Sequence, residues 1–176
     1  MNTAPPHDER FLELISENRP KLLKICRVYA WSATEQDDLY QEILLQIWRA
    51  LPSLKDAVHA NTWLYRVALN TAFGFVRKQK SHRTRVVSCD AEFLKEFPEI
   101  SSPNPDQKEQ LAQLFAAISQ LGDLEKAAIT LFLEDLSYEQ MAEVMGISES
   151  NVGVILHRAK KKLSTLMKEV PCRTTH

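Results

Sequence analysis

The chain has 176 residues, of which 44% are hydrophobic and 26% charged, so it is long enough for one ordinary domain or two small ones. Gly is rare, with 4 residues, whereas Leu, Ala, Glu, Gln and Lys are abundant, and this composition predicts an all-α fold. The net charge of -1 does not by itself indicate any partner.

The composition also argues against a membrane-embedded or disulfide-bonded protein. No apolar run approaches the ~18 residues of a membrane span, and the N-terminus lacks a signal-peptide pattern. We therefore expect a cytoplasmic protein without membrane insertion. The cysteines, Cys26, Cys89 and Cys172, are odd in number, widely spaced and without a C-x-x-C pair. They indicate neither a disulfide framework nor a zinc site, and we expect no metal and no cofactor.

Charged residues are clustered although the net charge is small. An acidic cluster comprises Glu35, Asp37, Asp38 and Glu42. Two basic clusters comprise Arg77, Lys78, Lys80, Arg83 and Arg85, and then Arg158, Lys160, Lys161 and Lys162. Such a protein can bind nucleic acid through both basic patches while its acidic surface stays free for a protein partner.

The first half of the chain shows helical periodicity. Apolar residues recur with helical spacing over 8–32, where Pro20 predicts a second segment or a kink. A second helix is expected from a start capped at Thr34, with Asp37 in its first turn, to Pro52. One side of it is the apolar stripe Tyr40, Ile43, Ile47 and Leu51. The other side carries Asp38, Gln41, Glu42, Leu45, Trp48 and Arg49. This second side fits a protein-binding surface, although composition alone favours a helix buried on two sides.

A third helix is predicted over 62–80. Its spacing turns Leu64, Val67, Ala68, Thr71 and Phe75 inward. The outward face then carries Arg66, Asn70, Phe73 and Arg77. A ring for stacking, an amide for base edges and two cations for phosphates suit single-stranded nucleic acid. An ordinary solvated basic face with one extra core Phe explains the same pattern equally well.

Residues 81–105 lack sustained periodicity and end in SSPNP, which predicts a flexible linker with a span of roughly 25–30 Å. Helices follow over 106–121 and from a cap at Asp123. Ser137 and Gln140 then predict a capping box, Gly146 a left-handed helix end, and Ser148 the cap of a final basic helix. Two capped helices joined by a short Gly-containing turn predict a helix-turn-helix.

Three segments in this order resemble bacterial RNA polymerase sigma factors of the extracytoplasmic-function (ECF) subfamily of the sigma-70 family. They are DDLYQEILLQIWRAL (37–51), TWLYRVALN with the following Arg77 (62–77), and LSYEQMAEVMGIS with NVGVILHRAKKKL (136–163). The resemblance covers nearly the whole chain. It implies a region 2-like domain over 8–80, a linker over 81–105 and a region 4-like helix-turn-helix domain over 106–170. It implies no enzyme activity.

The resemblance also implies partners, namely core RNA polymerase, promoter DNA and an anti-sigma factor. The expected core-polymerase-binding residues are Asp38, Gln41, Glu42, Leu45, Trp48 and Arg49. The residues expected to melt and hold the -10 element are Trp63, Arg66, Asn70, Phe73, Arg77 and Lys78. Those expected at the -35 element are Ser150, Asn151, Gly153, Val154, His157, Arg158 and Lys161.

This sequence departs from the family pattern where Gly74 replaces a frequent Asp, and where Gly153 and Ile155 replace frequent basic residues. A helical wheel turns Val154 outward, between Gly153 and Asn151 at its sides. Val154 can meet a thymine methyl and Asn151 a base edge. The cations at 158 and 160–162 are expected to contact phosphate, and DNA shape to carry more of the specificity.

Two other classes of protein fit parts of this sequence. A stand-alone helix-turn-helix regulator that binds duplex DNA explains the last third of the chain but not the acidic helix or the 66–77 stripe. A helical metal-carboxylate protein would use Asp37, Asp38 and Glu42, but adjacent acids at a helix start are ordinary compensation of the helix dipole.

Overall fold

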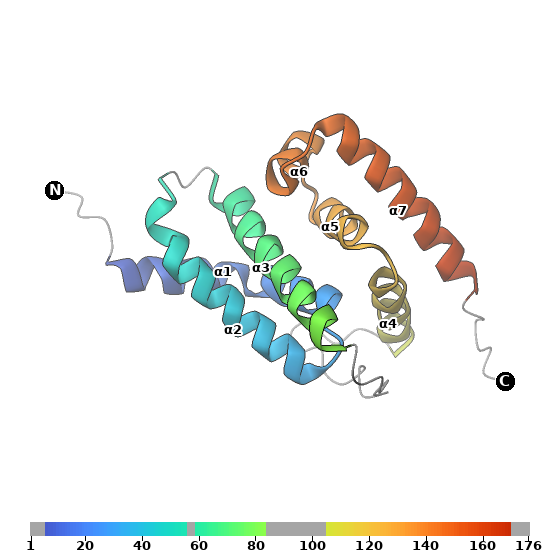
Figure 1. Ribbon diagram of the computed structural model, residues 1–176, viewed down its shortest axis with the longest axis horizontal. Helices are drawn as coiled ribbons and strands as arrows, with labels where there is room; N and C mark the ends of the chain where they lie inside the picture. Colours follow the sequence, from blue (N-terminus) through green and yellow to red (C-terminus); the bar gives the residue numbers. More distant parts are fainter. Residues whose placement is uncertain (1–5, 56–58, 84–104, 170–176) are drawn as a thin grey trace. The chain divides into compact units, whose positions relative to one another are not determined.

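The computed structural model describes residues 6–55, 59–83 and 105–169, and within these ranges the regular structure is helical, with no strand (Figure 1). The all-α prediction is therefore confirmed. The chain divides into two compact units. The first contains helices α1 to α3 and the second α4 to α7.

The first unit is a three-helix bundle built from α1 (His7–Tyr29), α2 (Ala33–Ala50) and α3 (Ala60–Arg83), with a short 3-10 helix, η1 (Leu51–Ser53), after α2. Its core is mainly aliphatic, with two buried tyrosines, Tyr29 and Tyr65. The largest buried aliphatic side chains are Leu22, Ile25, Leu39, Ile43, Ile47, Leu51 and Leu64. The apolar positions of α2 recur every three or four residues, so a single face of that helix packs on both neighbours.

Two local predictions in this unit are corrected. Pro20 lies inside a continuous α1 rather than at the start of a second segment. The cap of α2 is Ser32, not Thr34. The Glu35 backbone N–H donates to Ser32 Oγ at 3.2 Å, and Glu35 Oε2 accepts from the Trp31 backbone N–H at 2.8 Å. These two bonds satisfy backbone donors at the helix start that would otherwise lack a partner.

The second unit contains α4 (Pro105–Ser119), α5 (Asp123–Phe132), α6 (Tyr138–Met145) and α7 (Glu149–Glu169). Helix α5 is buried on all sides over residues 126–131, and α4, α6 and α7 contribute further buried side chains to the core. The largest buried side chains include Ile118, Leu131, Met141 and Leu156. Asp123 is the first residue of α5 rather than its cap, because Gly122 occupies the N-cap and its N–H donates to Glu125 Oε2 at 3.0 Å.

The capping signals of the helix-turn-helix are confirmed. Ser137 and Gln140 exchange side-chain-to-backbone bonds of 2.9 and 3.2 Å at the start of α6. Gly146 has φ 67° at its end, a conformation that favours glycine, and Ser148 Oγ accepts from the Asn151 N–H at 3.3 Å. These caps fix the turn between α6 and α7.

The predicted linker over 81–105 falls largely on 84–104, which lie outside the described residues. Its first residues, up to Arg83, extend α3, and Pro105 begins α4. None of the described helices is both long and apolar enough to span a bilayer.

Candidate protein and nucleic-acid interface

The polar side of α2 reaches solvent along its length. Five of its six candidate residues are exposed, including Leu45 at 41% and Trp48 at 38%, whereas Glu42 is half-buried. The indole of Trp48 is also a packing group. It contacts the rings of His7 and Phe11 on α1 edge to face, with centroids 4.1 and 5.0 Å away. Trp48 is thus partly covered by α1, and only its exposed part is available to a partner.

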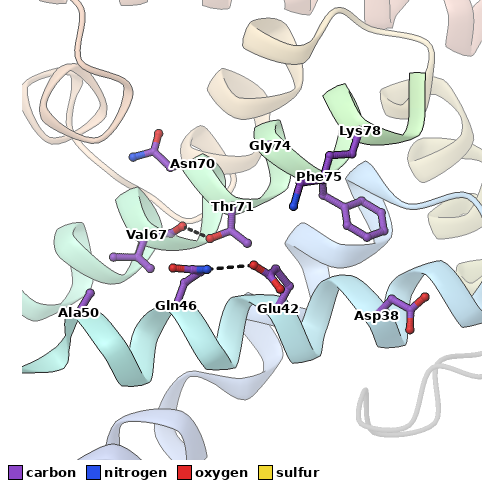
Figure 2. Close-up of a pocket in the computed structure, with 10 residues that line it drawn as sticks. All are labelled: Asp38, Glu42, Gln46, Ala50, Val67, Asn70, Thr71, Gly74, Phe75 and Lys78. Atoms are coloured by element: carbon purple, nitrogen blue, oxygen red, sulfur yellow. Dashed lines mark hydrogen bonds between the residues drawn. The ribbon is translucent and has the colours of Figure 1, made fainter. Parts of the chain in front are cut away.

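Glu42 faces a groove between α2 and α3 with a volume of about 630 Å³ (Figure 2). Gln46 Nε2 donates to Glu42 Oε1 at 2.9 Å, and Thr71 on α3 lies opposite this pair. Both helices line the groove. Its residues are Asp38, Glu42, Gln46, Ala50, Val67, Asn70, Thr71, Gly74, Phe75 and Lys78. Residues predicted to bind core polymerase and residues predicted to bind the -10 element therefore line the same groove. The sequence did not indicate this proximity.

The candidate stripe on α3 is only partly open to solvent. Arg66, Asn70, Arg77 and Lys78 are exposed, and Trp63 is half-buried. Phe73 is half-buried as well, because its ring packs edge-on against Tyr29 of α1, with centroids 5.8 Å apart. Phe73 thus offers a nucleobase less of its ring than the sequence predicted. Because Gly74 adjoins the groove, an added Cβ at this position would meet nothing within 4 Å.

Helix α7 has a buried face and an exposed face, and Val154 lies on the exposed one, as the helical wheel predicted. Val152, Leu156 and Ala159 are buried, and Ile155 and Leu163 are half-buried. The opposite face is exposed along the helix. It carries Ser150, Asn151, Val154, His157, Arg158 and Lys161. Val154 is 49% exposed, so an apolar side chain stands at the centre of this polar face.

Gly153 is less open than its position suggested. It is half-buried, and a Cβ built on it would lie 3.7 Å from Cε2 of Tyr138, the first residue of α6. Tyr138 is itself 45% exposed. An aromatic ring therefore borders the candidate DNA-reading face. Tyr138 was not among the predicted site residues, although its place at the start of the first helix of the helix-turn-helix can be read from the sequence.

The basic run of α7 does not have a uniform environment. Lys162 Nζ donates to both carboxylate oxygens of Glu125 at 2.7 and 2.9 Å, and Lys160 Nζ lies 3.5 Å from the ring centroid of Phe132. Both partners belong to α5. The Lys162 bonds hold the pKa of Glu125 below its ordinary value, and the Gly122 N–H adds to this effect. Two of the lysines that were expected to contact phosphate therefore also have partners on α5.

The described residues were found to contain no candidate metal-binding cluster. No three His, Cys, Asp or Glu side chains there converge on a possible metal site. Cys26 is buried in the first unit, and burial raises its pKa to about 12, which disfavours the nucleophilic thiolate.

Both units match models of one protein family. Residues 14–82 match Sigma-70 region 2, and residues 111–163 match Sigma-70, region 4. The RNA polymerase sigma-H factor of Pseudomonas aeruginosa is 31% identical over 175 residues, which cover 92% of this chain and 91% of that protein. The ECF RNA polymerase sigma-E factor of Escherichia coli K12 is 34% identical over 134 residues, or 72% and 70% of the two chains.

Solved structures show the same fold. The sigma factor RpoE from Bartonella quintana, determined with the anti-sigma factor NepR, aligns with a TM-score of 0.72 at 18% identity, covering 93% of this chain and 99% of that one. CnrH, determined with the cytosolic domain of CnrY, aligns with a TM-score of 0.64 at 21% identity, covering 93% and 91%.

The chain consists of a helical unit with an exposed acidic and apolar face and a second unit with a helix-turn-helix. Because both units match the same family, they define a transcription initiation factor. The chain belongs to the ECF subfamily of the sigma-70 family. It is a sigma factor that binds core RNA polymerase and promoter DNA and directs promoter-specific initiation. Sigma factors regulate the polymerase and are not themselves enzymes. A stand-alone regulator is not favoured, because it leaves the region 2 match unexplained.

Proposed function

We propose that three faces of the described helices divide the work of initiation among them. The outer face of α2 binds core polymerase, the exposed part of α3 holds the melted -10 strand, and α7 reads the -35 element. The observation that carries this proposal is the two-faced α7, with a buried stripe opposite a continuous exposed face of polar residues around Val154. That pattern suits a helix held by its own domain on one side and by a DNA groove on the other.

At the -35 element, α7 combines direct and indirect readout. Val154 offers an apolar surface to a thymine methyl, and Ser150 and Asn151 offer hydrogen-bonding groups to base edges. Arg158 and Lys161 neutralise phosphates, which positions the helix without specifying sequence. Tyr138 adds a ring beside Gly153, at the edge of the same face.

At the -10 element, exposed Arg66, Arg77 and Lys78 follow the phosphates of an unpaired strand, and Asn70 bonds a base edge. Trp63 and Phe73, both half-buried, present only parts of their rings. We therefore assign them to the walls of the strand-binding surface rather than to an open stacking platform.

At the polymerase, the anchors are Leu45 and Trp48, which are exposed apolar groups within a polar surface. The charged and amide groups around them set orientation and association rate. They are Asp38, Gln41, Glu42 and Arg49.

Regulation and location follow from these roles. Because the structural neighbours RpoE and CnrH were determined with NepR and CnrY, we propose that an anti-sigma factor also controls this chain. Its place of action is the cytoplasm, where the polymerase and the chromosome are. The catalytic chemistry belongs to the core enzyme, and no residue of this chain is assigned a catalytic role. The domain boundaries that we propose remain 8–80 and 106–170.

Run-off transcription tests the proposal. Core polymerase with the full chain is offered fragments of genomic DNA, and we expect discrete transcripts that core enzyme alone does not produce. A matched preparation with Asn70→Ala and Phe73→Ala should bind the same promoters but open them poorly, and a premelted -10 bubble should partly restore transcription. The proposal fails if no core-dependent transcripts form while the chain alone binds duplex DNA sequence-specifically.

A further inference from the structure

The cations in the middle of α7 occupy different sides of the helix. At 100° per residue, Lys160 and Lys162 lie about 200° apart, one on each flank of the buried stripe through Leu156 and Ala159. Lys161 lies between them and points away from that stripe. The three adjacent lysines thus face three different environments.

Both flanking lysines contact α5 at different points along it. Lys162 Nζ lies 2.7 and 2.9 Å from the two carboxylate oxygens of Glu125, in the first turn of α5. Lys160 Nζ lies 3.5 Å from the ring centroid of Phe132, the last residue of α5, a distance within cation–π range. The two contacts therefore join α7 to both ends of α5, one on each flank of the buried stripe of α7.

Glu125 is a well-fixed partner. Its side chain is 14% exposed, compared with 59% for Lys162, and it also accepts a hydrogen bond from the Gly122 N–H at 3.0 Å. That bond holds the carboxylate at the N-terminus of α5, where the helix dipole also favours a negative charge. A carboxylate fixed in this way orders the lysine bound to it.

We propose that Lys160 and Lys162 are positioning residues that hold α7 in its rotational setting on α5, and that Arg158 and Lys161 make the phosphate contacts. This inference rests on the proposed function of α7 as the -35 reader. Contacts on both flanks resist rotation of α7 in either direction. They keep Val154 and Asn151 turned towards the bases, so the two lysines affect sequence discrimination without touching DNA.

The test uses holoenzyme assembled from core polymerase and the full chain, with a duplex promoter fragment selected by the wild-type run-off assay. Binding is measured at several salt concentrations and on single -35 base-pair variants. Lys161→Gln should weaken binding to all sequences alike and lower the salt slope by about one unit. Lys162→Gln should leave the slope unchanged and reduce discrimination between -35 variants about twofold to fivefold. Lys160→Gln should act similarly, and Lys162→Arg should retain discrimination.

Glu125→Gln separates positioning from direct contact most sharply. If Lys162 is held for positioning, removing its partner reduces discrimination as Lys162→Gln does. If Lys162 contacts phosphate, Lys162→Gln lowers the slope by about one unit, whereas Glu125→Gln leaves binding unchanged or tightens it. That second result overturns the inference.

A thermal-unfolding double-mutant cycle between Glu125 and Lys162 does not depend on DNA. Significant coupling supports the Glu125–Lys162 contact as a positioning contact. A wild-type holoenzyme without promoter specificity would refute the proposed function but would leave this support intact. Additive effects on unfolding would refute the positioning contact and leave the proposed function untouched.

Discussion

Replacing Trp48 by Ala tests the assignment of α2 to core polymerase, and the structure shows what else the substitution removes. The indole makes edge-to-face contacts with His7 and Phe11. Each aromatic pair contributes about 0.5–1.5 kcal/mol beyond its buried area. Loss of the two pairs should therefore lower the free energy of unfolding of the first unit by about 1–3 kcal/mol, and loss of the buried indole surface should add to this. It should also remove an interface anchor. Such anchors contribute about 2 kcal/mol or more, which corresponds to an increase of roughly 30-fold in the Kd for core polymerase.

The matched control is Phe11→Ala. It removes a ring from the same cluster, on α1, and leaves the exposed edge of Trp48 in place. We expect Phe11→Ala to destabilise the unit while binding core polymerase nearly as wild type does. Both variants are compared at a temperature where circular dichroism shows full helicity, and Kd is measured by competition with labelled wild-type chain.

Two results would refute this reasoning. If helical Trp48→Ala binds core polymerase within twofold of wild type, the outer face of α2 is not the interface. If Phe11→Ala weakens binding as much as Trp48→Ala, the indole acts through the fold of α1 and α2 rather than by contact with the polymerase.

Three further predictions concern single positions. Gly74→Ala should raise the free energy of unfolding by up to about 1 kcal/mol in a denaturant titration, because the new methyl meets no neighbour; a loss of stability would contradict this. Cys26, in a chain with its other two cysteines replaced by Ser, should react with a thiol reagent at pH 8 far more slowly when folded than when unfolded. Since burial raises its pKa from 9.0 to about 12, its contribution to stability should be present below pH 9 and be lost as the pH rises towards 12. Gly153→Arg should change the base preference at the -35 element. Tyr138→Ala should alter the size of that change, because the new Arg side chain starts 3.7 Å from the Tyr138 ring. Strictly additive effects of the two substitutions on a randomised -35 library would exclude a contact between Arg and Tyr138.

The helix-turn-helix was predictable because its signals are local. A capping box spans four residues, and the left-handed Gly146 ends a helix whatever the rest of the chain does. The same kind of signal was available for α2. Both Ser32 and Thr34 are good caps, but Ser32 alone has a Glu three residues later. In the structure the side chain of this Glu35 accepts a hydrogen bond from the Trp31 backbone N–H, in addition to the bond between the Glu35 N–H and Ser32.

The environments of single side chains were less predictable because they depend on contacts between helices. A helical wheel shows on which side of α3 Phe73 lies, but it cannot show that Tyr29 of α1 contacts the Phe73 ring. The pairing of Lys162 with Glu125 joins residues 37 apart in sequence. A run of adjacent cations indicates a basic surface, but only the packing of α7 on α5 shows which of them are already engaged.

The groove between α2 and α3 limits what a charge substitution can show about this sigma factor. Glu42 and Lys78 line the same groove, so removing the carboxylate also changes the field at the cation assigned to the -10 strand. A variant such as Glu42→Lys therefore perturbs core binding and strand binding together. Leu45 and Trp48 are exposed on α2 and do not line the groove. Truncating them alters one interface without changing the charge near the other, so these two positions can separate polymerase binding from promoter melting.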